Sequence, residues 1–155
     1  MNWQEIAVKL IAPFEGCEKR LRGMIVPYLD KLAKPPVWTR GYGRTYGIVE
    51  TSPAITPAQA LIELQEGVQA YGMKCVALAP TLLNKPECLA AVDSWAWNCG
   101  IGAFKVSRLR RAINEGRWAD AAQYIRKPDT AGGVVYRGLT RRREAERVLF
   151  ILGAG

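Results

Sequence analysis

Glycine and proline gather in one stretch of the chain, between residues 16 and 56. The stretch contains, in order, Gly23, Pro27, Pro35, Pro36, Gly41, Gly43, Gly47 and Pro53. Both residue types interrupt helices and central strands, so this stretch has room only for short strands and loops. We therefore expect a small, irregular β-region over 16–56.

Helical patterns lie on both sides of this region. Apolar residues recur at helical spacing from Trp3 to Phe14, with a capping box at Asn2 and Glu5 and a stop at Gly16. Thr56-Pro57-Ala58-Gln59 opens a long helix to about residue 79. Further helices are predicted from 84–87 to a glycine-rich joint at 98–102, and over 104–114, 117–126 and, after a Gly132-Gly133 loop, 139–151.

These patterns together predict one domain over 1–155 with a mostly helical α+β fold. The small β-rich lobe covers about 16–56, and the larger helical lobe covers 1–15 and 57–155. We expect an active-site cleft between the two lobes.

The composition excludes several kinds of active site. The chain has 155 residues, no histidine and a formal net charge of +8. Without imidazole there is no Ser-His-Asp or Cys-His pair, no histidine general base and no histidine-bound zinc. The positive charge predicts attraction to an anionic partner, which can be nucleic acid, a membrane surface or an acidic polymer such as a cell wall.

The four cysteines, Cys17, Cys75, Cys88 and Cys99, do not have the spacing of a zinc site. We expect mostly free thiols, and Cys75 with Cys88 if any disulfide forms. No metal or cofactor is expected. The amino terminus carries no unbroken apolar run, so we expect neither a signal peptide nor a membrane anchor.

Any acid–base chemistry near neutral pH must then fall to carboxylates, tyrosine, lysine or cysteine. Glu15 ends the first helix, Asp30 follows Pro27-Tyr28-Leu29, and Thr39 precedes Gly41-Tyr42-Gly43. Two carboxyls and a hydroxyl around one cleft are the parts of a glycosidase. The bland interpretation, a solvated helix end and a turn-forming aspartate, is favoured by the residues alone.

A family resemblance changes this balance. Phe14-Glu15-Gly16, Tyr28-Leu29-Asp30 and Trp38-Thr39-Arg40-Gly41-Tyr42-Gly43-Arg44-Thr45 resemble the catalytic signature of the phage-type lysozymes, the muramidase endolysins. The resemblance continues in order through 96–104, 109–114, 132–133 and 138–146. It therefore covers nearly the whole chain and implies a lysozyme-like, two-lobed fold.

The resemblance also implies roles for individual residues. Glu15 would be the general acid, Asp30 would hold and activate a water molecule, and Thr39 would help to place that water. The spacings from Glu15 to Asp30 and from Asp30 to Thr39 are longer than is typical of the family, and Arg44 stands where many relatives have histidine. The resemblance further implies attack by water with inversion at the anomeric carbon, which requires carboxyls roughly 6.5–9.5 Å apart.

Other residues are candidates for contacts with the substrate. Trp97 and Asn98 could line the cleft, as could Tyr42, although Trp95 and Trp97 are more typical of a core. Arg141, Arg142 and Arg143 form the densest charge run, and we expect at least two of them on a solvated helix face. One of the three could instead pair with Glu15 and lower its pKa.

The resemblance thus implies a peptidoglycan hydrolase that cuts the β-1,4 bond between N-acetylmuramic acid and N-acetylglucosamine, and we expect it to be a monomer. We expect it to accumulate in the host cytoplasm and to reach the wall through a separate permeabilising protein. Peptidoglycan is the expected partner; nucleic acid and stable membrane insertion are not expected. The rival hypotheses are a basic nucleic-acid-binding module and a non-catalytic wall-binding relative.

Overall fold

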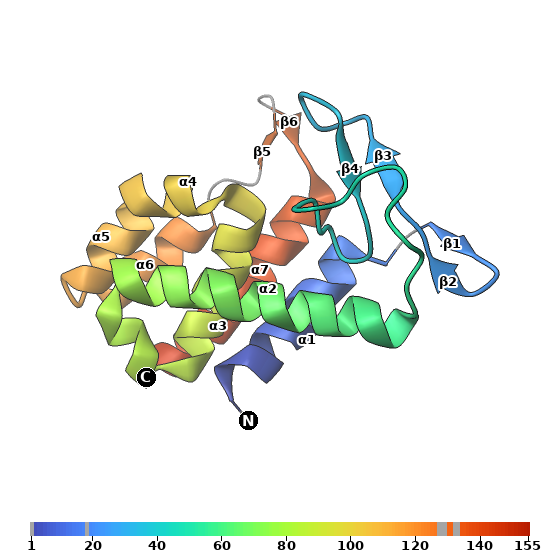
Figure 1. The fold of residues 1–155 in the computed structure, drawn as a ribbon. Coiled ribbons are helices and arrows are strands. Elements are labelled where there is room, and N and C mark those ends of the chain that lie inside the picture. The colour runs from blue at the N-terminus through green and yellow to red at the C-terminus, as the bar shows by residue number, and fades with distance from the viewer. Residues whose placement is uncertain (1, 18, 127–129, 132–133) are drawn as a thin grey trace. The chain divides into compact units, whose positions relative to one another are not determined.

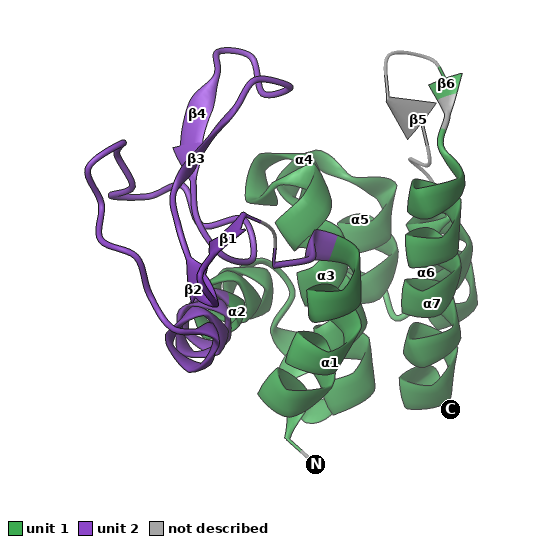
Figure 2. Cartoon of the chain, turned by 90° about the vertical axis from the view of Figure 1, so that its right-hand side faces the viewer, with its two compact units in different colours: residues 1–14, 68–155 green, residues 15–67 purple. Residues whose placement is uncertain are grey.

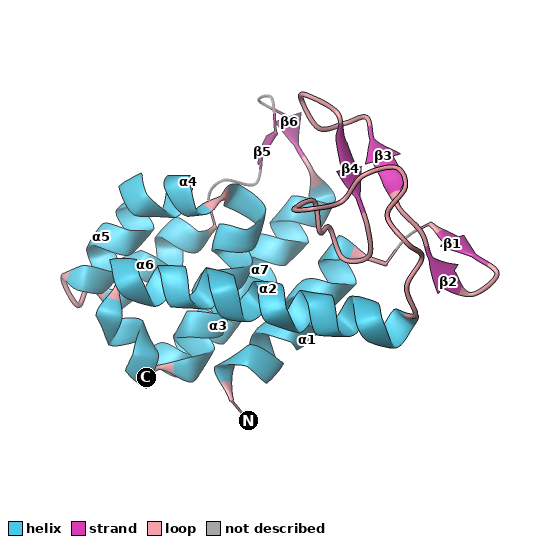
Figure 3. Cartoon of the chain, in the orientation of Figure 1, coloured by secondary structure: helices cyan, strands magenta, loops and turns pink. Residues whose placement is uncertain are grey.

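The computed structural model describes all residues except 1, 18, 127–129 and 132–133. The chain is mostly helical, with short strands between its first two helices and before its last one (Figures 1 and 3). The elements, in order, are α1 (Trp3–Glu15), β1 (Arg20–Leu21), β2 (Met24–Ile25), β3 (Tyr28–Asp30), β4 (Val37–Thr39), α2 (Pro57–Leu78), the 3-10 helix η1 (Pro80–Asn84), α3 (Pro86–Cys99), α4 (Ile101–Val106), α5 (Arg108–Asn114), α6 (Trp118–Ile125), β5 (Thr130–Ala131), β6 (Val134–Val135) and α7 (Arg137–Ala154).

The two helix starts predicted from capping boxes are confirmed. Asn2 Oδ1 accepts a hydrogen bond of 2.8 Å from the Glu5 amide at the start of α1. At α2 the Gln59 amide donates to Thr56 Oγ1 at 3.1 Å, and the Thr56 amide donates to Gln59 Oε1 at 2.8 Å. These bonds satisfy backbone amides that have no partner within the helix.

The chain divides into two compact units, coloured separately in Figure 2. Unit 1 comprises residues 1–14 and 68–155, and unit 2 comprises residues 15–67. The long helix α2 is continuous through the boundary, with its first half in unit 2 and its second half in unit 1.

Unit 1 is built around α3, which packs against α7, η1 and α4. Nine consecutive residues of α3, from Cys88 to Ala96, are buried, because neighbouring elements cover the helix on all sides. In the same unit α1 and α2 approach closely where the Trp3 ring lies over Gly72; a Cβ atom at Gly72 would lie 2.2 Å from that ring.

Unit 2 contains two short hairpins and a small core. β1 pairs with β2, and β3 pairs with β4, both antiparallel. The core consists of Ile25, Ile55 and Ala60, with Cys17 and Tyr42 packed against it. The Ile25 and Ile55 backbones exchange hydrogen bonds of 2.7 and 2.9 Å, which tie the first hairpin to the segment before α2. The expectation of short strands in this region is confirmed.

The continuous helix predicted over 104–114 is wrong. The chain forms α4 and α5 instead, and Ser107 separates them by accepting a hydrogen bond of 3.0 Å from the Arg110 amide through its hydroxyl. Neither η1 nor the β5–β6 pair was predicted from the sequence. The Gly132-Gly133 loop lies outside the described residues.

Two further observations concern the whole described chain. None of its helices is both long and apolar enough to cross a membrane. Cys75 and Cys88 are buried, Cys17 and Cys99 are half-buried, and all four carry free thiols in the structure.

Candidate active site

Glu15 is the last residue of α1 and the first residue of unit 2. Its half-buried carboxylate lies beside Gly43, where a Cβ atom would be 3.4 Å from Glu15 Oε2. Gly43 has a φ of 88°, in the left-handed region that glycine adopts readily. The backbone of the 41–43 loop can therefore pass close to the carboxylate without a side chain between them.

Asp30 and Thr39 lie on the β3–β4 hairpin of the same unit. Asp30 pairs with Val37, and Thr39 pairs with Tyr28. Because alternate residues of a strand share a face, Asp30 and Thr39 project to the same side of the hairpin as diagonal neighbours, about 7–8 Å apart. This register brings the second carboxyl and the hydroxyl together.

The same two side chains also make local hydrogen bonds. Asp30 Oδ1 accepts a bond of 2.9 Å from the Leu32 amide, which stabilises the turn after β3. Thr39 is only 4% exposed, and its hydroxyl donates to the Val37 carbonyl at 3.3 Å. The hairpin and the turn therefore restrict how both side chains can move.

The loop that follows Thr39 is fixed to α2 by two arginines. The Arg40 and Arg44 backbones exchange hydrogen bonds of 2.9 and 3.0 Å, which close the loop. The Arg40 guanidinium pairs with Glu63 and donates to the Pro53 carbonyl at 2.8 Å. Arg44 lies 3.4 Å from the Glu63 carboxylate. Both arginines thus have structural partners within unit 2.

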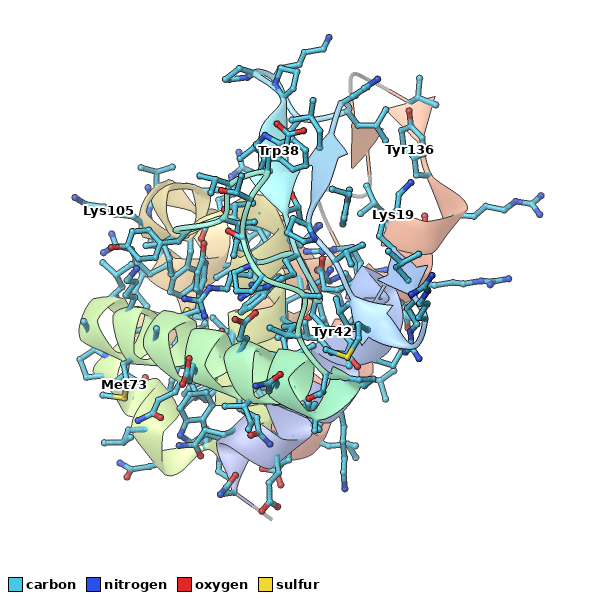
Figure 4. The ribbon with its side chains drawn as sticks, turned by 45° about the vertical axis from the view of Figure 1, so that its right-hand side comes forward. Lys19, Trp38, Tyr42, Met73, Lys105 and Tyr136 are labelled. Atoms are coloured by element: carbon cyan, nitrogen blue, oxygen red, sulfur yellow. The ribbon has the colours of Figure 1, made fainter. Side chains whose placement is uncertain are left out.

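Tyr42, a predicted substrate contact, is half-buried and packs against the small core of unit 2 (Figure 4). It also forms a hydrogen bond with the Cys17 thiol, whose pKa is raised chiefly by burial and lowered in part by Arg20 and by this bond. Tyr42 therefore has a structural role, and its contact with a substrate stays a prediction.

The other predicted substrate contacts, Trp97 and Asn98, belong to unit 1, at the carboxyl end of α3. Trp97 is half-buried and lies against Tyr71 with ring centres 5.3 Å apart, whereas Trp95 is a buried core residue. Asn98 is exposed, and its Oδ1 accepts a hydrogen bond of 2.7 Å from Arg143 Nη2. The structure therefore groups Glu15, Asp30, Thr39 and Tyr42 in one unit, and Trp97 and Asn98 in the other.

The expectation that at least two of Arg141, Arg142 and Arg143 are solvated is wrong. Arg142 and Arg143 are 3% and 1% exposed, because both guanidiniums surround the fully buried carboxylate of Glu146 at 3.2 Å. Their spacing of four and three residues from Glu146 puts all three on one face of α7. Only Arg141 is exposed.

Glu146 was missed by sequence reasoning, although its spacing from the two arginines was a usable signal. The Ser94 hydroxyl donates to Glu146 Oε1 at 2.7 Å and joins α3 to α7. Burial raises the pKa of Glu146, and the two arginines and Ser94 lower it in part. This cluster stabilises the contact between the two helices inside unit 1.

Asp93, also on α3, has no accessible surface and was not anticipated either. Within the described part of the chain neither of its carboxylate oxygens has a hydrogen-bond partner, and burial raises its pKa well above 3.8. No sequence signal marked it, because its burial depends on the packing of neighbouring helices.

A metal centre has no ligand set in the part of the chain that the structure covers: no group of three or more cysteine, aspartate or glutamate side chains there could hold a metal ion. Unit 2 therefore contains one carboxyl beside Gly43, and a second carboxyl and a buried hydroxyl on one face of the β3–β4 hairpin. Groups of these kinds can transfer protons and activate water.

Comparison with known proteins agrees with this description. Residues 13–146 match the family model for phage lysozyme, and the chain belongs to the phage lysozyme family. The muramidase domain of SpmX from Asticaccaulis excentricus has a similar structure, with a TM-score of 0.79 and 28% identity over 94% of each chain. The mostly helical, lysozyme-like fold predicted from the sequence is thereby confirmed.

Two curated relatives carry related names. The endolysin of Bacillus phage PZA is 32% identical over 99% of this chain and 56% of its own length. The SAR-endolysin of Enterobacteria phage P21 is 30% identical over 83% of this chain and 75% of its own length. The chain spans about half the length of the Bacillus phage endolysins that it matches.

Proposed function

We propose that the protein is a peptidoglycan hydrolase that cleaves the β-1,4 bond between N-acetylmuramic acid and N-acetylglucosamine. The observation that carries the proposal is the arrangement inside unit 2, where Glu15 lies beside Gly43 and where Asp30 and Thr39 share one face of a hairpin. Membership of the phage lysozyme family supports it, as do relatives named endolysin and muramidase.

In the proposed mechanism Glu15 protonates the glycosidic oxygen as the bond breaks. Asp30 accepts a proton from the attacking water, and the Thr39 hydroxyl helps to orient that water. Attack from the face opposite the leaving group gives inversion at the anomeric carbon. Each step uses side chains of this chain alone, so the mechanism needs neither metal nor cofactor.

Other parts of the proposal concern the substrate and the whole molecule. Tyr42, Trp97 and Asn98 would contact the glycan or its peptide. Residues 1–155 would act as one catalytic domain and as a monomer, without binding nucleic acid or inserting stably into a membrane. The enzyme would stay in the host cytoplasm until a separate protein opened the membrane, and would then act on the wall.

A turbidity assay on purified Gram-negative peptidoglycan tests the proposal with wild type, Glu15→Gln and the control Glu50→Gln. Glu50 is an exposed carboxylate of the same unit, so its variant loses the same charge away from Gly43. Loss of a general acid costs roughly 10²–10⁴-fold in rate. We expect that loss for Glu15→Gln and wild-type rates for Glu50→Gln.

The products discriminate the reaction class. A glycosidase releases reducing ends, and NMR of the newly formed anomer reports inversion or retention. Release of free amino groups would instead indicate an amidase or peptidase. If Glu15→Gln lysed as fast as wild type, Glu15 could not be the general acid.

A further inference from the structure

Helices α4 and α5 carry an uneven distribution of charge. Residues 101–114 include four basic residues and no acidic one. The four are Lys105, Arg108, Arg110 and Arg111. Their four positive charges equal half of the formal net charge of +8.

Packing of the two helices turns three of these charges outward. α5 buries Leu109, Ala112 and Ile113 in the core of unit 1. Arg108 and Arg111 are three residues apart and exposed on the other side of the same helix. On α4 the buried Phe104 ring anchors the helix, and the adjacent Lys105 projects from it (Figure 4). The exposed residues Lys105, Arg108 and Arg111 are called the basic face below.

The charges of the basic face are not balanced within the molecule. Among the described residues no ion pair involves any of its three members. The nearest acidic residues along the chain, Glu115 and Asp120, are both bound by Arg117, at 2.6 and 2.5 Å. The basic face therefore keeps its positive potential for an external anion.

Its surroundings are apolar rather than uniformly charged. Val106 lies within the basic face and is 77% exposed, and the small residues Gly102 and Ala103 of α4 are exposed as well. A phosphate polymer can pair with the charged side chains, but its backbone has few apolar groups to cover the exposed Val106 and Ala103. A peptide that combines small apolar side chains with free carboxylates matches both parts of it, because guanidiniums bind carboxylates through two parallel hydrogen bonds.

We propose that the basic face binds the stem peptides of peptidoglycan through their free carboxylates. The inference rests on the proposed function, since the stem peptide belongs to that substrate. Single exposed ion pairs are weak, but a wall presents the same peptide many times, and repeated contacts keep the enzyme at the surface.

The test compares two variants that lose the same charge. The first is Lys105→Gln/Arg108→Gln/Arg111→Gln. The second is Lys19→Gln/Arg20→Gln/Arg22→Gln, which neutralises an exposed cluster on the β1–β2 hairpin (Figure 4 labels Lys19). Binding is measured by pelleting with insoluble sacculi stripped of attached polymers. We expect the first variant to bind roughly tenfold more weakly than the second, as three exposed ion pairs imply.

A second arm identifies the ligand. Sacculi whose carboxyls have been converted to amides should bind wild type as weakly as untreated sacculi bind the first variant. Equal loss in both variants would mean that net charge alone governs binding and would overturn the proposal. So would unchanged binding to amidated sacculi, or binding of wild type only to a parallel sample of sacculi that keeps its phosphate polymers. Release of reducing ends by wild type is scored separately, so failure of the proposed function is recognised independently.

Discussion

Asp93 is the residue whose replacement gives the sharpest test of the packing of unit 1. Its side chain is fully buried in α3, and among the described residues its carboxylate oxygens have no hydrogen-bond partner. Burial therefore raises its pKa well above 3.8, because the charged form loses its hydration. We expect Asp93→Asn, which keeps the shape and cannot ionise, to stabilise the protein near neutral pH.

The direction of the pH dependence follows from the protonation of Asp93 in the unfolded and folded states. The unfolded chain releases the proton near pH 3.8, whereas the folded protein retains it to a higher pH. The stabilising contribution of protonated Asp93 is fully present below pH 3.8 and is lost as the pH rises toward the pKa of the folded state. Each pH unit in that interval removes about 1.36 kcal/mol from the free energy of unfolding.

Urea unfolding at a series of pH values above 3.8 measures this loss. The difference between Asp93→Asn and wild type should grow by about 1.4 kcal/mol per pH unit, or about 3–5 °C in Tm. Glu146 also has a raised pKa, but it is present in both proteins, so its contribution cancels in the difference between their free energies of unfolding. The control Asp120→Asn, at an exposed site, should show no such growth. Parallel curves for wild type and Asp93→Asn would refute the reasoning.

Two glycine substitutions test one close approach in each unit, and a third serves as a control. Gly72→Ala places a Cβ atom 2.2 Å from the Trp3 ring and should lower stability by about 1–3 kcal/mol; an unchanged Tm would contradict this. Gly43→Ala and Gly47→Ala introduce similar backbone strain, at φ values of 88° and 70°, of about 1–2 kcal/mol. Only the Cβ at position 43 meets the Glu15 carboxylate, so lysis should fall further for Gly43→Ala, and equal rates would count against that contact's role.

Local signals in the sequence were sufficient for the ends of the first long helices. The caps at Asn2 and Thr56 depend on side chains within three residues, so they can be recognised without the rest of the fold. Ser107 offers the same kind of signal, but the apolar residues on both sides of it continue the helical pattern and favour a single helix. The Ser107 hydroxyl caps the new helix by accepting from the amide three residues later, so a serine inside an apolar helical pattern can mark the start of a second helix.

Burial of charged residues could not be anticipated in this way. Arg142 and Arg143 read as a solvated run because a charge run on a helix usually is one. Their burial requires Glu146 on the same helix and Ser94 on another, and the second of these contacts is a tertiary one. The burial of Asp93 likewise depends on the packing of neighbouring helices, which the local sequence does not show. For the candidate site, motif spacing identified Glu15, Asp30 and Thr39, but only the strand register puts the last two on one face.

The division of the chain also bears on how the protein is made. Unit 1 is discontinuous: residues 3–14 of α1 belong to it, but Gly72, against which Trp3 packs, follows only after the whole of unit 2 has been synthesised. Unit 2 is one continuous segment, so it can complete its hairpins and small core while the rest of the chain is still being translated. Helix α1 can pack only after α2 has been synthesised, because its Trp3 ring lies against Gly72 of α2. Because long-range closure of this kind is slow, unit 1 should be the last part of a newborn chain to resist proteolysis.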